Sequence, residues 1–267
     1  MLIAQLSDLH IAKGRTKLYG LVDTSTMLER AVAHLIALTP RPNAVVITGD
    51  LVESGSSADY SLLRELLEPI FQRKQSMRCY LLAGNHDNRR ALRREFGDCA
   101  YLNQSEEYIQ YSALLGPLKL IALDTTVPGF SHGELCSERL KWFEQELKVD
   151  RRPTIVAMHH PPFASGIASM DASSLIIKDK FENLVSNHTQ IERIICGHLH
   201  RPIQARVGNT LASVAPSIAH QTHLDFDVSK PGQFIMEPPG YQLHWWNGKQ
   251  LVTHTIAVGD YGAKHLY

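Results

Sequence analysis

The sequence predicts an α/β fold in which short strands alternate with amphipathic helices. Aliphatic and β-branched runs alternate, over most of the 267-residue chain, with stretches whose apolar residues recur at helical spacing. The composition, 44% hydrophobic and 20% charged, is ordinary for a globular protein that can bury a large core. We therefore expect a single domain, residues 1–267, built from stacked βα units rather than from a helical bundle or an all-β sandwich.

Seven segments have the length and composition of strands. They are short, rich in aliphatic and β-branched side chains, and bounded by polar residues or glycine. In chain order they are Leu2 to Leu6, Ala44 to Thr48, Cys79 to Ala83, Leu118 to Leu123, Thr154 to Met158, Arg193 to Cys196 and Leu211 to Ala215.

Four helices are predicted between these strands. In the first, apolar pairs recur every three to four residues from Met27 to Ile36, and Pro40 and Pro42 mark its end. The same spacing recurs from Leu62 to Phe71. The remaining two helices are predicted from Glu138 to Leu147 and from Leu175 to Val185, each leading into a strand.

The C-terminal part of the chain has a different pattern. The stretch from Gln221 to Gly240 is polar and rich in proline, so we expect a long surface excursion or a subunit-contact arm. Beyond it, Asn247-Gly248 separates two strand-like runs and favours a hairpin turn. We expect residues 221–256 to act as a cap or oligomerisation arm of the single domain.

Charge composition limits the classes of partner. Lys plus Arg equals Asp plus Glu, with 27 residues in each group, so no net charge attracts a nucleic acid polymer or an anionic membrane. There is also no basic stripe with interleaved aromatic residues that would stack on bases of a polymer. A small substrate is the better expectation.

The cysteines and the N-terminus favour the cytoplasm. We expect all four cysteines to be reduced core thiols, because they are widely spaced and two lie in apolar runs. They are Cys79, Cys99, Cys136 and Cys196. The N-terminus lacks the pattern of a secretory signal, and no apolar stretch approaches the roughly 18 residues that span a bilayer.

Residues of metal-binding type follow five of the predicted strands. The carboxyl ends of strands form one edge of an open α/β sheet, where ligands bind, so we expect these clusters to meet in space. In chain order the clusters are Asp8-Leu9-His10, Gly49-Asp50, Gly84-Asn85-His86-Asp87, His159-His160 and Gly197-His198-Leu199-His200.

Spacing supports a metal centre at two of the clusters. Residues two apart on an extended segment project to the same side, so Asp8 with His10, and His198 with His200, can each present two ligands. Glycine before Asp50, Asn85 and His198 permits sharp turns and close approach. Carboxylates, an amide and imidazoles without thiolate suit a pair of divalent ions such as Fe, Mn, Zn or Co, with Asp50 as the candidate bridge.

Each cluster alone has a purely structural explanation. A lone Asp-x-His pattern rarely marks a metal site. Gly-Asp after a strand is often a turn or a helix cap, and histidines also occur with satisfied hydrogen bonds in cores. Capping and packing do not explain why all five clusters follow strands and carry metal-compatible side chains.

These five clusters resemble the signature of the calcineurin-like metallophosphoesterase superfamily, and the resemblance extends over nearly the whole chain. Lys17-Leu18-Tyr19-Gly20, the segment Met158 to Pro162 and His220-Gln221 are similar to the class III cyclic nucleotide phosphodiesterases and the bacterial glycerophosphodiesterases. The resemblance implies a four-layer α/β/β/α sandwich, with a C-terminal arm or hairpin. It also implies phosphodiester hydrolysis by a hydroxide that bridges two metal ions.

The resemblance further implies a division of the ligands between two ions. Asp50 would belong to both sets. One ion would be held by Asp8, His10, Asp50 and His200, and the other by Asp50, Asn85, His159 and His198.

Roles near the substrate also come from the resemblance. His86 would contact the phosphate and donate a hydrogen bond or a proton to the leaving oxygen, and His220 is a second candidate acid or a packing residue. Asn85 and Tyr19 are candidate substrate contacts. Asp87 would orient a neighbouring histidine.

Two further assignments remain open at this stage. Adjacent residues on an extended segment point in opposite directions, so only one of His159 and His160 should face the metals. The resemblance favours His159, and we expect His160 to support the loop. Lys13, Arg15 and Lys17 lie in the loop after the first ligand pair, where basic residues are either substrate contacts or solvated surface.

The resemblance favours a cyclic nucleotide substrate, either the 3′,5′ form such as cAMP or the 2′,3′ form. A glycerophosphodiester is the alternative. A noncatalytic interaction module that holds metal structurally is the alternative from a different class. Relatives of this kind assemble through loops and a C-terminal arm, so a homo-oligomer is expected.

Overall fold

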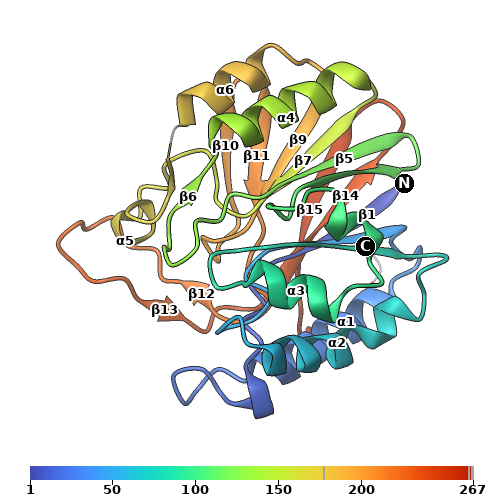
Figure 1. The fold of residues 1–267 in the computed structure, drawn as a ribbon. Coiled ribbons are helices and arrows are strands. Elements are labelled where there is room, and N and C mark those ends of the chain that lie inside the picture. Colours follow the sequence, from blue (N-terminus) through green and yellow to red (C-terminus); the bar gives the residue numbers. More distant parts are fainter. Residues whose placement is uncertain (177, 264, 266–267) are drawn as a thin grey trace.

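Two β-sheets packed face to face form the centre of the molecule, and helices cover the outer face of each (Figure 1). The computed structural model describes residues 1–176, 178–263 and 265. Helices α1 (Thr24–Ala37) and α2 (Ser57–Phe71) cover one sheet, and α4 (Ser137–Val149) and α6 (Lys178–Ser186) cover the other. The predicted α/β/β/α arrangement is therefore confirmed.

The first sheet has five strands in the order β15-β14-β1-β2-β3. The three strands that precede helices or site loops run parallel, whereas β14 pairs antiparallel with β1. Their bounds are β1 Leu2–Leu6, β2 Ala44–Thr48, β3 Arg78–Leu82, β14 Gly240–Trp246 and β15 Leu251–Ala257. Every residue of β2 is buried, as expected for a strand covered on both faces.

The second sheet has six strands in the order β10-β11-β9-β7-β5-β4. Strands β5, β7, β9 and β11 run parallel, and the two edge strands are antiparallel to their neighbours. The bounds are β4 Tyr111–Leu115, β5 Leu118–Leu123, β7 Thr154–Met158, β9 Ile191–Cys196, β10 Ile203–Val207 and β11 Thr210–Val214.

The helices begin where local side chains satisfy the free backbone amides of the first turn. The Asp23 side chain accepts a hydrogen bond from Thr26 N at the start of α1. At the start of α2, Ser56 and Asp59 form a reciprocal capping box. These caps fix where each helix begins, at the end of the loop that follows β1 or β2.

The predicted helix from Leu175 to Val185 is wrong in its first turn. Leu175–Ile176 is strand β8, which pairs in parallel with β6 (Gly133–Glu134), and residue 177 lies outside the described residues. The helix begins only at Lys178. A two-residue strand leaves no periodic pattern, so the apolar pair at its position resembles the start of the helix.

Several short elements were not predicted. They connect the larger strands and helices. They are α3 Arg89–Glu95, α5 Ala168–Asp171, β12 Gln221–Thr222, β13 Phe234–Ile235 and the 3₁₀ turns η1 Lys13–Arg15 and η2 Ala100–Asn103.

The C-terminal hairpin is part of the first sheet. Strands β14 and β15 pair from Gly240–Ala257 to Trp246–Leu251, as the hairpin prediction requires, and β14 lies against β1. The projecting part of the predicted 221–256 arm is therefore confined to the segment before β14, which carries β12 and β13 (Figure 1). A role of this segment as a cap or in oligomerisation stays a prediction.

Buried amide side chains join the two sheets. Gln5 Nε2 on β1 donates to Cys196 O on β9 at 2.8 Å and to Thr48 Oγ1 at 3.0 Å. Gln242 Nε2 on β14 donates to Val214 O on β11 at 3.0 Å. A buried amide is costly unless its hydrogen bonds are made, so these contacts favour one relative position of the two sheets.

The four cysteines are free thiols, as predicted, with Cys79 and Cys196 buried and Cys99 and Cys136 half-buried. Over the described residues, every helix is too short or too polar to cross a membrane.

Candidate metal centre

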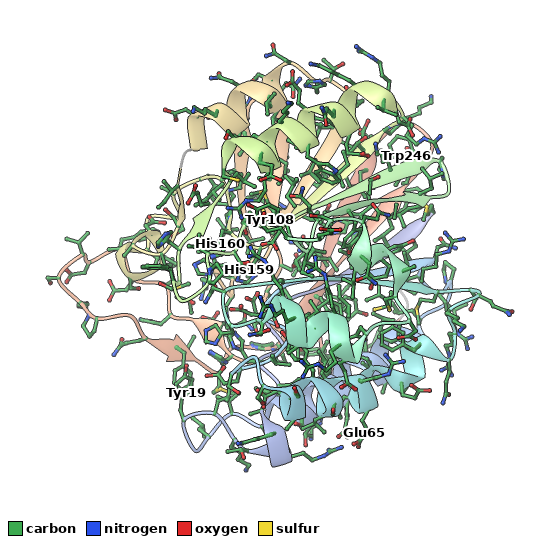
Figure 2. All side chains as sticks on the ribbon, in the orientation of Figure 1. Tyr19, Glu65, Tyr108, His159, His160 and Trp246 are labelled. Atoms are coloured by element: carbon green, nitrogen blue, oxygen red, sulfur yellow. The ribbon has the colours of Figure 1, made fainter. Side chains whose placement is uncertain are left out.

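The five predicted clusters meet where the ends of the two sheets come together. Three follow β1, β2 and β3 of the first sheet, and two follow β7 and β9 of the second. Figure 2 shows His159 and His160 at this junction, midway between the two helical layers. The convergence expected from the carboxyl ends of the strands is therefore present.

One group of buried donors contains the four residues that the resemblance assigns to one ion. Their ligand atoms lie within 4.8 Å of one another, and the residues are Asp8, His10, Asp50 and His200. His10 Nε2 lies 3.0 Å from His200 Nε2, and His200 Nε2 lies 3.5 Å from Asp8 Oδ1.

The second predicted set is also assembled. Asn85 Oδ1 lies 3.1 Å from His159 Nε2 and 3.1 Å from His198 Nδ1. Asp50 Oδ2 lies 3.4 Å from His159 Nε2. Four side chains that come from both sheets therefore lie close together.

Asp50 lies between the two sets. Its Oδ2 atom is 3.6 Å from His10 Nε2 on one side and 3.4 Å from His159 Nε2 on the other. Its other oxygen, Oδ1, accepts a hydrogen bond from His86 N at 2.9 Å, which fixes the carboxylate orientation. One oxygen atom is therefore within reach of both donor sets.

Each histidine of these sets has one ring nitrogen held from outside the centre, which leaves the other facing inward. His10 Nδ1 is held by Glu53 Oε2 at 2.9 Å, and His159 Nδ1 by Thr48 O at 2.8 Å. His200 Nδ1 contacts His220 O at 3.0 Å, and His198 Nε2 contacts Ser173 Oγ at 3.0 Å. Such outer contacts select the tautomer and orient a ligating imidazole.

The inward atoms are therefore lone-pair acceptors that face one another. A backbone carbonyl can only accept, so Nδ1 of His159 and of His200 carries a proton, and in the neutral ring that binds metal Nε2 carries the lone pair. His159 Nε2 then faces the Asn85 amide oxygen, and His200 Nε2 faces His10 Nε2. Acceptors at such distances repel unless a cation or a proton lies between them, so the donor set fits bound metal ions.

The four histidines of the two sets differ in pKa, which is raised for His10 and His159 and lowered for His198 and His200. Burial lowers the pKa of His198 and of His200 to about 3, so both offer a lone pair near neutral pH. Burial also opposes the charged form of His159, but the negative charge of Asp50 raises its pKa to about 9. The same negative charge would attract a cation.

Strained backbone is concentrated at the predicted ligands. Among the described residues, seven other than glycine have positive φ, and five of them are predicted ligands. These five are Asp8, His10, Asp50, His198 and His200. Such conformations cost on the order of 1–3 kcal/mol each and persist where function requires them.

The glycines before the ligands make room for protein atoms. A Cβ at Gly84 would collide with the backbone and side chain of Asp50, and one at Gly49 would collide with the His159 ring. Gly49 also has φ of 94°. The turns at these positions therefore need glycine so that ligands from different strands can approach one another.

The two candidate acids differ in exposure. The His86 side chain is 36% exposed, and its Nδ1 contacts Glu53 O at 2.8 Å, so Nε2 is the ring nitrogen that could face a substrate. His220 is 7% exposed, its ring lies 4.7 Å from that of His200, and burial lowers its pKa to about 3. A buried imidazole that resists protonation is a poor acid, so the geometry favours His86.

Asp87 and His160 are held by contacts outside the donor sets. Asp87 Oδ2 accepts from Gly84 N at 2.8 Å and from Leu51 N at 3.1 Å, so it organises the loop that carries Asn85 and His86. One ring nitrogen of His160 lies within 4.8 Å of ring nitrogens of His159 and His198, so distance alone would allow His160 to be a metal ligand.

Both ring nitrogens of His160 are engaged elsewhere. Nδ1 contacts Thr125 Oγ1 at 2.8 Å and Nε2 contacts Ser131 O at 3.0 Å. Neither nitrogen offers a free lone pair to the centre. These contacts support the loop-supporting role over a role as metal ligand.

The loop after the first ligand pair places Tyr19 near the site. The Tyr19 ring lies 5.9 Å from that of His220 and is 69% exposed, and Figure 2 shows it at the edge of the molecule below His159. Arg15 instead pairs with Glu29 at 2.8 Å, and Lys13 and Lys17 are exposed.

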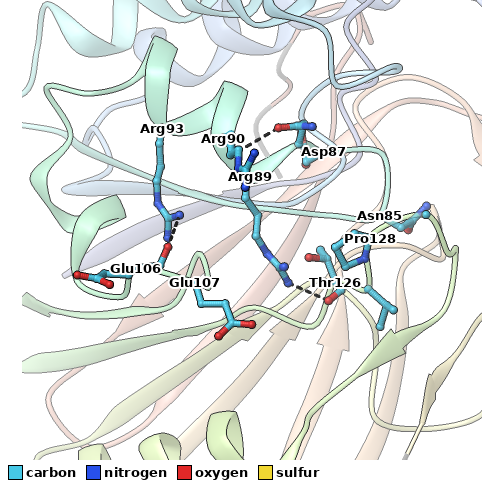
Figure 3. A pocket seen from close by; sticks show the side chains of 12 residues that line it. Asn85, Asp87, Arg89, Arg90, Arg93, Glu106, Glu107, Thr126 and Pro128 are labelled. Atoms are coloured by element: carbon cyan, nitrogen blue, oxygen red, sulfur yellow. Dashed lines mark hydrogen bonds between the residues drawn. The ribbon is translucent and has the colours of Figure 1, made fainter.

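A cleft of about 540 Å³ opens beside Asn85 and Asp87 (Figure 3). Its arginines are largely occupied by protein partners. Arg89 pairs with Asp124 at 2.7 Å and donates to Thr126 O at 2.9 Å, and Arg93 donates to Glu106 O at 2.8 Å. The cleft touches only one edge of the donor sets, so the donor sets themselves mark the reactive centre.

Sequence reasoning missed two residues that hold the ligands. Glu53 holds His10 with its carboxylate and the His86 ring with its backbone carbonyl. It follows Asp50 by three positions, so it is a carboxylate near a strand end that could have been considered. Ser173, which contacts His198, comes from the loop before β8 and has no sequence signal.

Comparison with known proteins identifies a matching family and several sequence relatives. A family model described as calcineurin-like phosphoesterase matches residues 1–202. A probable glycerophosphodiester phosphodiesterase from Arcobacter nitrofigilis is 33% identical over 98% of this chain and 94% of its own length. A cAMP/cGMP dual specificity phosphodiesterase from Mycobacterium tuberculosis is 33% identical over 83% of this chain and 69% of its own.

The fold also matches solved structures. A dimetal phosphatase from Danio rerio superposes with a TM-score of 0.68, covering 97% of this chain and 99% of that protein. The sequence identity is 11%, so this likeness establishes the fold alone.

Proposed function

The chain belongs to the calcineurin-like phosphoesterase family and is a metal-dependent phosphodiesterase, and from this premise we propose that it hydrolyses cyclic nucleotides at a binuclear centre. The substrate would be the 3′,5′-cyclic or the 2′,3′-cyclic form, or both.

One observation carries the binuclear part of the proposal. Asp50 Oδ2 lies within 3.6 Å of His10 Nε2 and 3.4 Å of His159 Nε2, so a single carboxylate oxygen reaches both donor sets. Bridging carboxylates are a common feature of two-metal sites. Asp8, His10 and His200 would complete one site, and Asn85, His159 and His198 the other.

When bound, the two ions would supply the positive charge that makes a water nucleophilic near neutral pH and neutralises the nonbridging phosphate oxygens. Oxygen and imidazole donors without thiolate suit Fe, Mn, Zn or Co.

Residues of the chain would handle the leaving group. His86 lies beside Asn85 at the open side of the site, with Nδ1 held by Glu53 O at 2.8 Å. Its Nε2 atom can therefore face a bound phosphodiester and donate a hydrogen bond or a proton to the departing oxygen. Asn85 and Tyr19 would also contact the substrate.

The choice of substrate rests on the relatives and on charge. The relative from Mycobacterium tuberculosis is named for activity on cAMP and cGMP. Equal numbers of acidic and basic residues argue against a polyanionic polymer and for a small phosphodiester.

A glycerophosphodiester is the second candidate. The relative from Arcobacter nitrofigilis, named as a probable glycerophosphodiester phosphodiesterase, matches 98% of this chain. Coverage of nearly the whole chain includes the C-terminal hairpin and the segment before it, which form part of the surroundings of the site.

Comparing purified protein on several substrates tests the proposal. The protein, loaded in turn with defined metals, should hydrolyse 3′,5′-cyclic AMP or 2′,3′-cyclic AMP with higher kcat/KM than glycerophosphoethanolamine. The reverse order would favour the second candidate.

A noncatalytic interaction module, the alternative from a different class, makes a separate prediction. It would hold metal without turning over even a reactive diester such as bis(4-nitrophenyl) phosphate. Two equivalents of metal together with hydrolysis of that diester exclude the module. The segment 221–239 would contribute to assembly as a homo-oligomer, which the molar mass in solution can test.

A further inference from the structure

Two aromatic side chains from distant parts of the chain stack on each other beside the metal centre. The rings of Tyr19, in the loop after β1, and Phe234, in β13, lie 4.9 Å apart at an interplanar angle of 25°. We propose that this pair, here called the aromatic wall, binds the flat ring of the substrate and makes the site selective for phosphodiesters that carry a nucleobase or an aryl group. The inference rests on the proposed function, because it concerns the same site.

The aromatic wall adjoins the ligands through His220. The His220 ring lies 5.9 Å from Tyr19 and 5.2 Å from Phe234, and on its other side it lies 4.7 Å from His200. One ring therefore separates the wall from a proposed metal ligand. A substituent of a phosphate bound at the metals can reach the wall without leaving the site.

The conformation of Tyr19 is not one that packing or turn formation would select. Tyr19 has φ of 52° and Gly20 has φ of 69°, in a turn closed by Leu21 N donating to Leu18 O at 2.9 Å. Turns with two positive φ values favour Asn-Gly, and a bulky aromatic residue there is strained. Tyr19 shares this unusual feature with five proposed ligands.

The exposure of both rings is consistent with a binding surface. Tyr19 is 69% exposed and Phe234 is 36% exposed, so both rings are open to a ligand. An open hollow of about 480 Å³ is lined in part by His223, Gln233 and Phe234. This volume is in the range of small-molecule sites.

Stacking explains why the wall would discriminate between substrates. Every base has a flat π-face that an aromatic side chain can cover, and loss of one such contact weakens binding by about tenfold. A glycerol or ethanolamine substituent has no such face. Removing a ring should therefore affect nucleotide substrates and spare aliphatic ones.

The experiment compares Tyr19→Ala and Phe234→Ala with the wild type on three diesters: 3′,5′-cyclic AMP, bis(4-nitrophenyl) phosphate and glycerophosphoethanolamine. We expect kcat/KM to fall about tenfold for the two ring-bearing substrates, mainly through KM, and to change less than about twofold for the aliphatic one. Tyr19→Phe and Phe234→Tyr should restore the wild-type values, because each keeps a ring.

Phe226→Ala is the matched control. Phe226 belongs to the same surface segment and is 66% exposed, but it lies against Gly166 rather than His220. This variant should leave all three substrates unchanged.

Three results would overturn the proposal. One is an equal loss on aliphatic and ring-bearing substrates, another is wild-type behaviour of both alanine variants, and the third is a Tyr19→Leu variant as selective as the wild type. If the alanine variants change the oligomeric state and lose all substrates together, the wall is a contact between copies.

Failure of the proposed function gives a different result. In that case the wild type does not hydrolyse cyclic AMP, while the comparison of aryl with aliphatic diesters still tests the aromatic wall. Metal content equal to that of the wild type shows that each variant remains folded at the site.

Discussion

Glu53 Oε2 lies 2.9 Å from His10 Nδ1, and the two side chains form a carboxylate–imidazole pair directed at the metal centre. A carboxylate in this position holds the ring orientation and makes the opposite nitrogen a stronger donor. Glu53, which is not itself a proposed ligand, should therefore strengthen metal binding by His10.

Replacing Glu53 with Gln should weaken metal binding. Loss of an outer partner of a ligating histidine typically lowers affinity about 10- to 100-fold, and chelator competition can measure this directly. Glu65→Gln is the control, because Glu65 is an exposed acid paired with Arg15 at 3.4 Å, away from the centre. Equal affinities for Glu53→Gln and the wild type would show that Glu53 does not support the ligand.

Replacing Asp50 with Ala should remove both metal ions and activity while the protein stays folded. One Asp50 oxygen reaches both donor sets, so its loss affects both sites at once. Metal analysis by mass spectrometry and circular dichroism check the two parts of the prediction. Retention of two equivalents of metal with full phosphodiesterase activity would falsify the binuclear proposal.

Replacing His86 with Ala should separate metal binding from turnover. His86 Nδ1 is held by a backbone carbonyl and not by the donor sets, so metal content should be unchanged. Loss of a general acid lowers kcat about 100-fold or more. If His220→Ala gives the larger decrease in kcat with metal retained, the acid has been assigned to the wrong histidine.

Chelation should destabilise the folded protein. A ligand that binds only the folded state adds about 4 kcal/mol when its free concentration is about 1,000 times Kd. Thermal unfolding with and without a chelator should therefore show a lower Tm for the metal-free protein. The Asp50→Ala variant should show almost no such difference, and a full shift in that variant would argue that the metals bind elsewhere.

Replacing Arg89 with Met should destabilise the fold by about 3–5 kcal/mol at pH 7, because the variant leaves Asp124 buried without its partner. Arg64→Met is the matched control. The Arg64 partner, Asp98, is 59% exposed, so its loss should cost less than about 1 kcal/mol. Urea unfolding measures both values.

The effect of Arg89→Met should shrink in acid. Burial raises the pKa of Asp124, but the hydrogen bond and charge of Arg89 outweigh burial and hold this pKa below its ordinary value. The stabilisation is present above the pKa of an unfolded aspartate and is lost as pH falls through the lower folded pKa. A difference between variant and wild type that stays constant down to pH 2 would contradict this account.

The parallel strands and the ligands could be predicted because their signals are local. Strands such as Leu2–Leu6 and Thr154–Met158 are short apolar runs, and polar residues directly follow them, so a rule about strand ends places Asp8 and His159 together. Alternation along the chain allowed only one of His159 and His160 to face the centre, and the family resemblance favoured His159, which agrees with the outward contacts of His160.

The rest depends on contacts between distant segments. Ser173 reaches His198, and Phe234 reaches Tyr19, only because loops from different layers meet, and nothing in either local sequence encodes the meeting. Strand β8 is two residues long and exists through its pairing with β6, so the adjoining helical pattern masks it. Backbone strain at Asp8 or His200 is likewise invisible before the fold is known.

Because of this backbone strain, stability and catalysis favour different residues at the proposed ligand positions. At five proposed ligand positions the chain adopts a conformation that glycine would occupy more easily, yet glycine carries no metal-binding group. A search for heat-resistant variants that scores only survival of the fold should therefore accept substitutions there that abolish turnover. A search that also selects for hydrolysis should retain aspartate and histidine at these positions.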